Sequence, residues 1–134
     1  MSLTTTTTTT TKAAVLSRKP LREGTYGRVI KTTMTDGRIF AVKETSLTSE
    51  QYRTSANREA AFFVASAVRK HEHKHIIRAH NVAATSRLQT IILEFMPGGD
   101  LVDHINAYQG KIGWYYAMTF FRQLSSAVAF LHSN

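Results

Sequence analysis

The 134-residue chain contains no cysteine, which excludes disulfide bonds and thiolate metal ligands. It has no apolar run near the roughly 20 residues that a membrane span needs. Its first residues also lack the apolar core of a secretory signal. We therefore expect an intracellular protein, cytoplasmic or nuclear, that makes no membrane contact.

Acidic residues are the minority among the charged ones. Seventeen Lys and Arg stand against nine Asp and Glu, which gives a formal net charge of +8. The basic residues are scattered rather than gathered in a block, so the charge favours phosphate-rich partners without predicting a specific nucleic acid. A basic binder of nucleic acid or another polyanion remains one alternative.

The N-terminal segment is low in complexity, since residues 4–11 are eight consecutive threonines. β-branched side chains disfavour helix, and a homopolymer has no apolar face to bury. We expect residues 1–14 to be a disordered tail. The rest of the chain is different, because a hydrophobic content of 43% is enough for a folded core.

The first folded segment carries a strand pattern. Residues 28–35 are rich in β-branched side chains, Asp36-Gly37 is a hairpin signal, and residues 38–44 alternate apolar and polar. An earlier glycine-containing turn separates these residues from a first strand. Together these features predict a three-stranded antiparallel meander.

A helix follows, because residues 56–70 are alanine-rich and free of Gly and Pro. We expect a capping box of Thr48 and Gln51 at its start. Phe63 and Val64 lie on its apolar stripe.

The second half of the chain predicts strands at 76–85 and 89–95, then a connector broken by glycines. A short helix capped by Asp100 and a long helix over 113–132 come last. The predicted fold class is therefore α+β: a five-stranded antiparallel sheet with one helix, a hinge and two more helices.

The segment LREGTYGRV, residues 21–29, places Gly24 and Gly27 three residues apart. A hairpin over a nucleotide needs residues without Cβ where its backbone approaches phosphate oxygens, although most such glycine pairs are simply turns. Lys43 lies on the strand that follows this hairpin, which places its ammonium beneath the loop. Glu59, on the helix face beside Phe63, is the candidate counter-charge, and a solvated helix surface is the alternative for it.

Histidines alternate at the end of the helix. Their imidazoles are potential zinc ligands, and they are His71, His73, His75 and the nearby His80. No cysteine or nearby carboxylate pair completes a shell. A basic, solvated loop is therefore the better interpretation, and we expect no metal site.

Six segments in this order resemble the N-terminal half of a eukaryotic-type serine/threonine protein kinase, and the likeness covers about residues 15–134. The last helices look most like the calcium/calmodulin-dependent and related groups. The resemblance implies a nucleotide-binding lobe over 15–95, then the hinge and the start of a second lobe over 96–134. The segments are LREGTYGRV, AVK, NREAAFF, HKHIIRAH, IILEFMPGGDLVDHI and FFRQLSSAVAFLHSN.

The resemblance also implies roles toward the phosphates of ATP. Lys43 would hold the α- and β-phosphates, and Glu59 would be its partner on the helix. Tyr26 would be the aromatic residue at the tip of the loop. The glycine-rich loop over ATP would comprise Gly24, Thr25, Tyr26 and Gly27.

By the same resemblance, further residues would contact the base. Val29 and Ala41 would roof the adenine, and Leu93 would be the gatekeeper. Backbone groups of Glu94 and Met96 would offer hydrogen bonds to the adenine.

Asp100 would hold the ribose, although a helix cap explains this aspartate equally well. Arg22 departs from the family pattern, because it occupies the first glycine position of the loop. A side chain there restricts the backbone and crowds the nucleotide near ribose and adenine. We expect ATP binding to be weakened or reshaped rather than abolished.

The resemblance stops at LHSN, and the catalytic loop and Asp-Phe-Gly metal site of the family are not in this sequence. Phosphoryl transfer relies on positioned magnesium and an oriented hydroxyl. We therefore expect ATP as the cofactor, magnesium only together with second-lobe ligands, and no efficient catalysis by this chain itself. Protein substrates are expected only when a second lobe completes the site.

The last helix carries an apolar stripe that includes Trp114, Phe121, Leu124, Val128 and Leu131. Left bare, it would form a patch on the order of several hundred Å², large for a soluble monomer. The expected explanations are a truncated product, or a fragment that pairs the 114–131 face with itself or a partner protein. The leading function is the ATP-binding part of a kinase, and the alternative is a non-catalytic, pseudokinase-like nucleotide-binding or kinase-interacting module.

Overall fold

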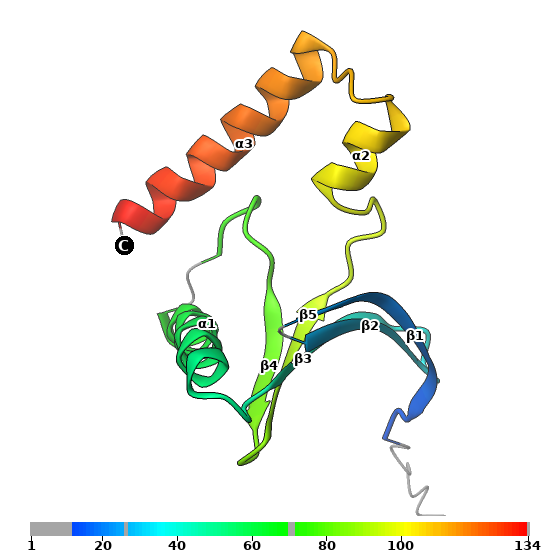
Figure 1. Cartoon of the computed structure of the whole chain (residues 1–134), viewed down its shortest axis with the longest axis vertical. Coiled ribbons are helices and arrows are strands. Elements are labelled where there is room, and N and C mark those ends of the chain that lie inside the picture. Colours follow the sequence, from blue (N-terminus) through cyan, green and yellow to red (C-terminus); the bar gives the residue numbers. More distant parts are fainter. Residues whose placement is uncertain (1–11, 26, 70–71, 134) are drawn as a thin grey trace, which may run out of the picture.

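The computed structural model describes residues 12–25, 27–69 and 72–133. Most of the expected tail, Tyr26 and His71 thus lie outside the described residues. Five strands and one helix precede two further helices in the described part, so the α+β prediction is confirmed (Figure 1). The elements are β1 (Val15–Gly24), β2 (Gly27–Met34), β3 (Ile39–Ser46), α1 (Glu50–Arg69), β4 (Ala79–Ala84), β5 (Leu88–Glu94), α2 (Leu101–Ala107) and α3 (Trp114–Ser133).

The strands form one antiparallel sheet in the order β1-β2-β3-β5-β4. The predicted turn between β2 and β3 is confirmed: Gly37 takes a φ of +86° there, which a side chain would resist. Asp36 stabilises the same turn, because its Oδ1 accepts a hydrogen bond of 3.1 Å from the amide of Arg38. Two register shifts interrupt the pairing of β1 with β2, and Figure 1 shows both strands curving.

The core lies on the face of the sheet that α1 covers. Buried Ala41, Ile91 and Leu93 pack together with Phe63 of α1, and α1 contacts β3 and β4. Burying a side chain of the size of Phe63 or Ile91 contributes about 1.5–3 kcal/mol. This packing fixes the rotation of α1, and therefore the direction in which its polar residues point.

The start of α1 corrects the predicted capping box. The Ser49 hydroxyl accepts a 3.3 Å hydrogen bond from the amide of Tyr52, whereas the Thr48 hydroxyl pairs with that of Ser46. The cap is therefore Ser49, one residue later than predicted. The prediction for Val64 was also wrong, since it is 51% exposed while Phe63 is 9% exposed; neighbouring helical positions point about 100° apart.

β4 begins at Ala79, three residues later than the predicted position 76. The preceding residues form a turn in which the amide of Ile76 donates to the carbonyl of His73. Apolar composition alone predicted a strand here, but the chain first has to reverse after α1. Ile76 and Ile77 are still partly buried, so their hydrophobic character serves packing.

The two last helices lie on the other side of the hinge segment from the sheet (Figure 1). Asp100 caps α2, as predicted, and α2 buries none of its residues. α3 approaches the segment before β4, where the His73 Nε2 atom lies 3.0 Å from the Ser126 hydroxyl. Within the described ranges, no helix combines the length and the apolar character that crossing a membrane requires.

Candidate functional site

Lys43 of β3 and Glu59 of α1 form an ion pair between sheet and helix. The Lys43 Nζ atom lies 2.8 and 2.7 Å from the two Glu59 carboxylate oxygens. The side chains are 34% and 33% exposed, so water screens their attraction less than on an open surface. The structure thus brings together the two residues predicted to act as a unit, while their role toward a phosphate stays a prediction.

Packing of α1 explains why Glu59 points at the sheet. Glu59 precedes Phe63 by one helical turn, and residues four apart lie on the same face. Phe63 belongs to the buried core with Ala41 and Leu93. Burial of the phenyl ring therefore directs the carboxylate toward β3.

The residues predicted to lie around an adenine share the sheet face of Lys43. Val29 is directly opposite Lys43 in the pairing of β2 with β3, and Ala41 is opposite Leu93 in the pairing of β3 with β5. Side chains two residues apart on a strand point to the same face, so all four lie on one side of the sheet. Their contact with a base remains a prediction.

The two loop glycines differ in their surroundings. A Cβ on Gly27 would overlap the carbonyl oxygen of Glu44, and Gly27 has a φ of +147°. A Cβ on Gly24 would have no atom within 4 Å. Gly27 is therefore required by the close approach of β2 to β3, a reason that the sequence analysis missed. Gly24 has no such structural requirement.

Glu94, one of the two predicted hinge residues, offers fewer free hydrogen-bonding groups than the sequence suggested. The amide of Glu94 donates a 3.0 Å hydrogen bond to the carbonyl of Arg78, and its carboxylate accepts a 2.7 Å bond from the amide of Arg78. Because its amide and its carboxylate are already bonded to Arg78, the predicted hydrogen bond from Glu94 to an adenine is left to its carbonyl oxygen. Met96, the other predicted hinge residue, has a side chain that is half exposed.

Arg22 and Asp100 are in contact, which the sequence analysis did not foresee. The Arg22 Nη2 atom lies 2.6 Å from Asp100 Oδ2 and 3.9 Å from Asp103 Oδ1. Asp100 Oδ1 accepts a hydrogen bond of 2.9 Å from the amide of Asp103, and the Asp103 carboxylate accepts one from the amide of Asp100. Two aspartates three residues apart could have predicted this capping box, whereas no spacing along the sequence signals the contact with Arg22.

The electrostatics of this contact favour a charged Asp100. The amide of Asp103 is the largest influence, and with the Arg22 guanidinium it holds the pKa of Asp100 below its ordinary value. Arg22 and Asp100 are the residues predicted at the first glycine position and at the ribose. The structure places them against each other.

A second network, on the opposite face of the sheet, was also missed. The Glu44 carboxylate accepts hydrogen bonds of 2.6 Å from Arg18 and 2.7 Å from Arg28. Burial of Glu44 opposes its ionisation and is the largest single influence, but the two arginines outweigh it and lower its pKa. These residues tie β1, β2 and β3 together and do not belong to the Lys43 site, because side chains of adjacent residues point to opposite faces.

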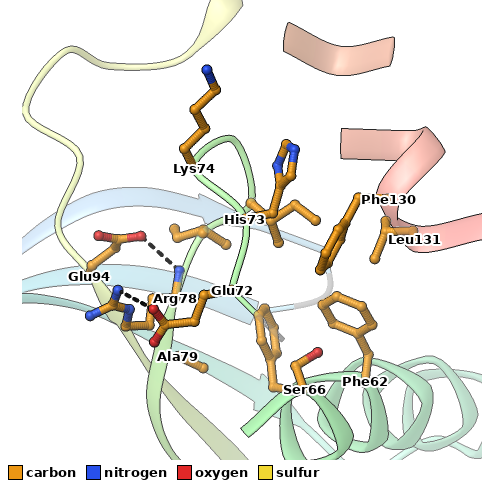
Figure 2. A pocket seen from close by; sticks show the side chains of 13 residues that line it. Phe62, Ser66, Glu72, His73, Lys74, Arg78, Ala79, Glu94, Phe130 and Leu131 are labelled. Atoms are coloured by element: carbon orange, nitrogen blue, oxygen red, sulfur yellow. Dashed lines mark hydrogen bonds and ion pairs between the residues drawn. The ribbon is translucent and has the colours of Figure 1, made fainter. Parts of the chain in front are cut away.

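A cavity of about 800 Å³ lies between α1, the segment before β4, and α3. Figure 2 shows Phe130 of α3 pointing toward α1 and its Phe62, with the Arg78–Glu72 ion pair at the edge. Neither Lys43 nor Glu59 lines this cavity, whereas Glu94, which is predicted to contact the base, lies at its border. Nowhere in residues 12–25, 27–69 and 72–133 do three potential His, Cys, Asp or Glu ligands gather around a metal position.

Comparison with known proteins identifies the family. Residues 17–134 match the protein kinase domain, so the chain belongs to the protein kinase family. NUAK family SNF1-like kinase 2 of Homo sapiens is 35% identical over 117 residues, which are 85% of this chain and 18% of that protein. CBL-interacting protein kinase 1 of Oryza sativa subsp. japonica is 29% identical over 131 residues, 92% of this chain and 27% of that protein.

A solved structure shows the same fold. Rad53 1–466 in complex with AMP-PNP superposes with a TM-score of 0.68 at 24% identity, covering 90% of this chain and 30% of the other. The resemblance to the N-terminal part of a serine/threonine kinase domain is thereby confirmed. The chain spans about a fifth of the length of the first curated relative that it matches.

Proposed function

We propose that this chain is the ATP-binding part of a serine/threonine protein kinase. The observation that carries the proposal is the Lys43–Glu59 pair, with both Nζ–oxygen distances below 3 Å. It lies on the sheet face that also carries Val29, Ala41 and Leu93. An ammonium held above an apolar sheet face, beneath a glycine loop, suits a triphosphate attached to a flat base.

The residues present fit a nucleotide. An ammonium has three donor hydrogens; two face the oxygens of Glu59, which leaves one for a phosphate oxygen. Glu59 would hold the ammonium in place, so that less side-chain entropy is lost when the phosphate binds. Around Gly24 there is space for phosphate oxygens, because no atom lies within 4 Å of the position of a Cβ.

Bound ATP would supply the phosphoryl group, and the described residues would bind and orient it. Transfer to a protein hydroxyl needs a positioned metal ion and an oriented acceptor. We therefore expect magnesium and protein substrates to act only where a second lobe completes the site, and no efficient transfer by this chain itself. An intracellular location, cytoplasmic or nuclear, remains part of the proposal because cells hold ATP inside.

Thermal unfolding with and without ATP tests the proposal. A ligand at 100 times its Kd stabilises the native state by about 2.7 kcal/mol, so we expect saturating ATP to raise the Tm of the chain. The Lys43→Met variant should lose this rise. Lys111→Met is the matched control, because Lys111 is exposed in the segment between α2 and α3. An unchanged Tm of the unmodified chain would contradict the proposal.

A second candidate is a non-catalytic, pseudokinase-like module that binds nucleotide or another kinase. The exposed face of α3 favours it, since Trp114, Phe121 and Leu124 are 78%, 64% and 64% exposed. This face would serve self-association or a partner protein.

Binding of a polyanion is the third candidate, and heparin binding that survives Lys43→Met would support it.

A further inference from the structure

The Arg22–Asp100 ion pair lies at the edge of the proposed nucleotide site. In the antiparallel pairing of β1 with β2, Arg22 is directly opposite Val29. Residues directly opposite on an antiparallel pair point to the same face, and Val29 is likewise opposite Lys43. Arg22 therefore belongs to the face of the sheet that carries the Lys43–Glu59 pair. Asp100 approaches that edge from the start of α2.

Both oxygens of the Asp100 carboxylate are engaged. Oδ1 accepts from the amide of Asp103 at 2.9 Å, and Oδ2 receives Arg22 at 2.6 Å. The capping bond fixes the orientation of the carboxylate, so its remaining oxygen faces the guanidinium. Each carboxylate oxygen has two lone pairs, so a ribose hydroxyl that approached Oδ2 would compete with the Arg22 guanidinium for the same oxygen.

We propose that Arg22 is a specificity-determining residue that withholds Asp100 from the ribose hydroxyls of a bound nucleotide. The inference rests on the proposed function of the site. The nucleotide would then be held through its base and phosphates, and the chain would bind ATP and 2′,3′-dideoxy-ATP with nearly equal affinity. A glycine or an uncharged residue at position 22 would release the carboxylate and restore discrimination for the hydroxyls.

The exposure of the pair sets the size of the effect. The Arg22 and Asp100 side chains are 60% and 44% exposed, and exposed pairs are weak and sensitive to salt. The pair therefore competes with a hydroxyl without blocking the site to the whole nucleotide. Freeing the carboxylate to accept one hydrogen bond from the ribose should raise the preference for ATP over 2′,3′-dideoxy-ATP about three- to tenfold.

Calorimetric titration of the whole chain with ATP and with 2′,3′-dideoxy-ATP tests the inference. We expect a Kd ratio near one for the unmodified chain, and a preference for ATP of about three- to tenfold in Arg22→Gln. Arg38→Gln is the matched control, because Arg38 forms an equally exposed ion pair with Asp36 in the hairpin between β2 and β3. Its ratio should stay near one.

Two further variants show whether Arg22 acts through Asp100. Arg22→Gly should give the same preference as Arg22→Gln, which separates loss of the charge from any effect of the new side chain. In an Asp100→Ala background, Arg22→Gln should leave the ratio at one, because the acceptor is gone. High salt should raise the ratio of the unmodified chain, since it screens the ion pair.

The outcomes separate this inference from the proposed function. If both nucleotides bind but Arg22→Gln leaves their ratio unchanged, the inference is wrong and the proposed function stands. If Arg22→Gln weakens both equally, Arg22 contacts the phosphates and the inference is wrong. If neither nucleotide binds to any variant, the proposed function and the inference fail together.

Discussion

Gly27 of β2 lies so close to the main chain of Glu44 in β3 that a Cβ on Gly27 would overlap the Glu44 carbonyl oxygen. The contact explains Gly27 by strand packing. It gives no structural reason for Gly24, whose role toward a nucleotide stays a prediction. A Cβ on Gly24 would meet no atom within 4 Å apart from those of the neighbouring residues. The two positions should therefore respond differently to the same substitution.

We expect Gly27→Ala to lower the free energy of unfolding by on the order of 2–3 kcal/mol, because it combines a backbone clash with a left-handed φ. Gly24→Ala should change stability by about 0.5 kcal/mol or less but weaken ATP binding. Urea denaturation and calorimetry measure the two effects. Equal losses of stability in both variants would contradict the assignment.

Glu59→Gln should weaken ATP binding with little effect on folding. The amide keeps the shape of the carboxylate but not its negative charge, so it holds the Lys43 ammonium less strongly and Lys43 is less well positioned. Because both side chains are about one-third exposed, we expect stability to fall by about 1 kcal/mol or less. Calorimetry should show a smaller loss of affinity than in Lys43→Met. A loss of stability with unchanged ATP affinity would indicate a purely structural pair.

Glu44 should make folding sensitive to acid. Its pKa is lowered in the folded state, so its stabilising effect is complete above the pKa of an unfolded glutamate, about 4.3. The effect is lost as the pH falls through the lower, folded-state pKa. We expect Glu44→Gln to be less stable than the unmodified chain at pH 7 and to lose less stability between pH 5 and pH 3.

Urea denaturation across this pH range measures the effect. Glu72→Gln is the control, because the Glu72 side chain is 67% exposed in its pair with Arg78. Its acid dependence should match that of the unmodified chain. If Glu44→Gln shows the same acid dependence as well, the network of Glu44 with Arg18 and Arg28 does not contribute to the pH response.

The outer face of α3 should promote association. Phe121 and Leu124 are both 64% exposed, and water disfavours contiguous apolar surface. We expect sedimentation velocity to show concentration-dependent association that Phe121→Gln with Leu124→Gln abolishes. The control is Lys111→Gln, at an exposed lysine in the segment between α2 and α3, and it should leave association unchanged. A monomer at every concentration would remove self-association as a role for this face.

Much of the fold could be predicted because local rules decide it. The Asp36-Gly37 turn, the alternation along β3 and the cap at Asp100 each depend on neighbours within a few residues. The predictions were wrong where two neighbouring residues fitted the same local pattern. Ser49 and Thr48 are both good caps, and the Thr48 hydroxyl pairs instead with that of Ser46 at the end of β3. Val64 and Phe63 are both apolar, and packing against the sheet buries Phe63.

For the candidate site, the sequence by itself determined which chemistry is present: two glycines, a lysine on a strand and a glutamate on a helix, in the order of a protein kinase. The tertiary structure decided which groups meet. Lys43 meets Glu59 because burial of Phe63 turns α1 toward the sheet. Arg22 meets Asp100, and Gly27 meets Glu44, through contacts between strands and across the hinge. Such pairings depend on distances through space, which no spacing along the chain specifies.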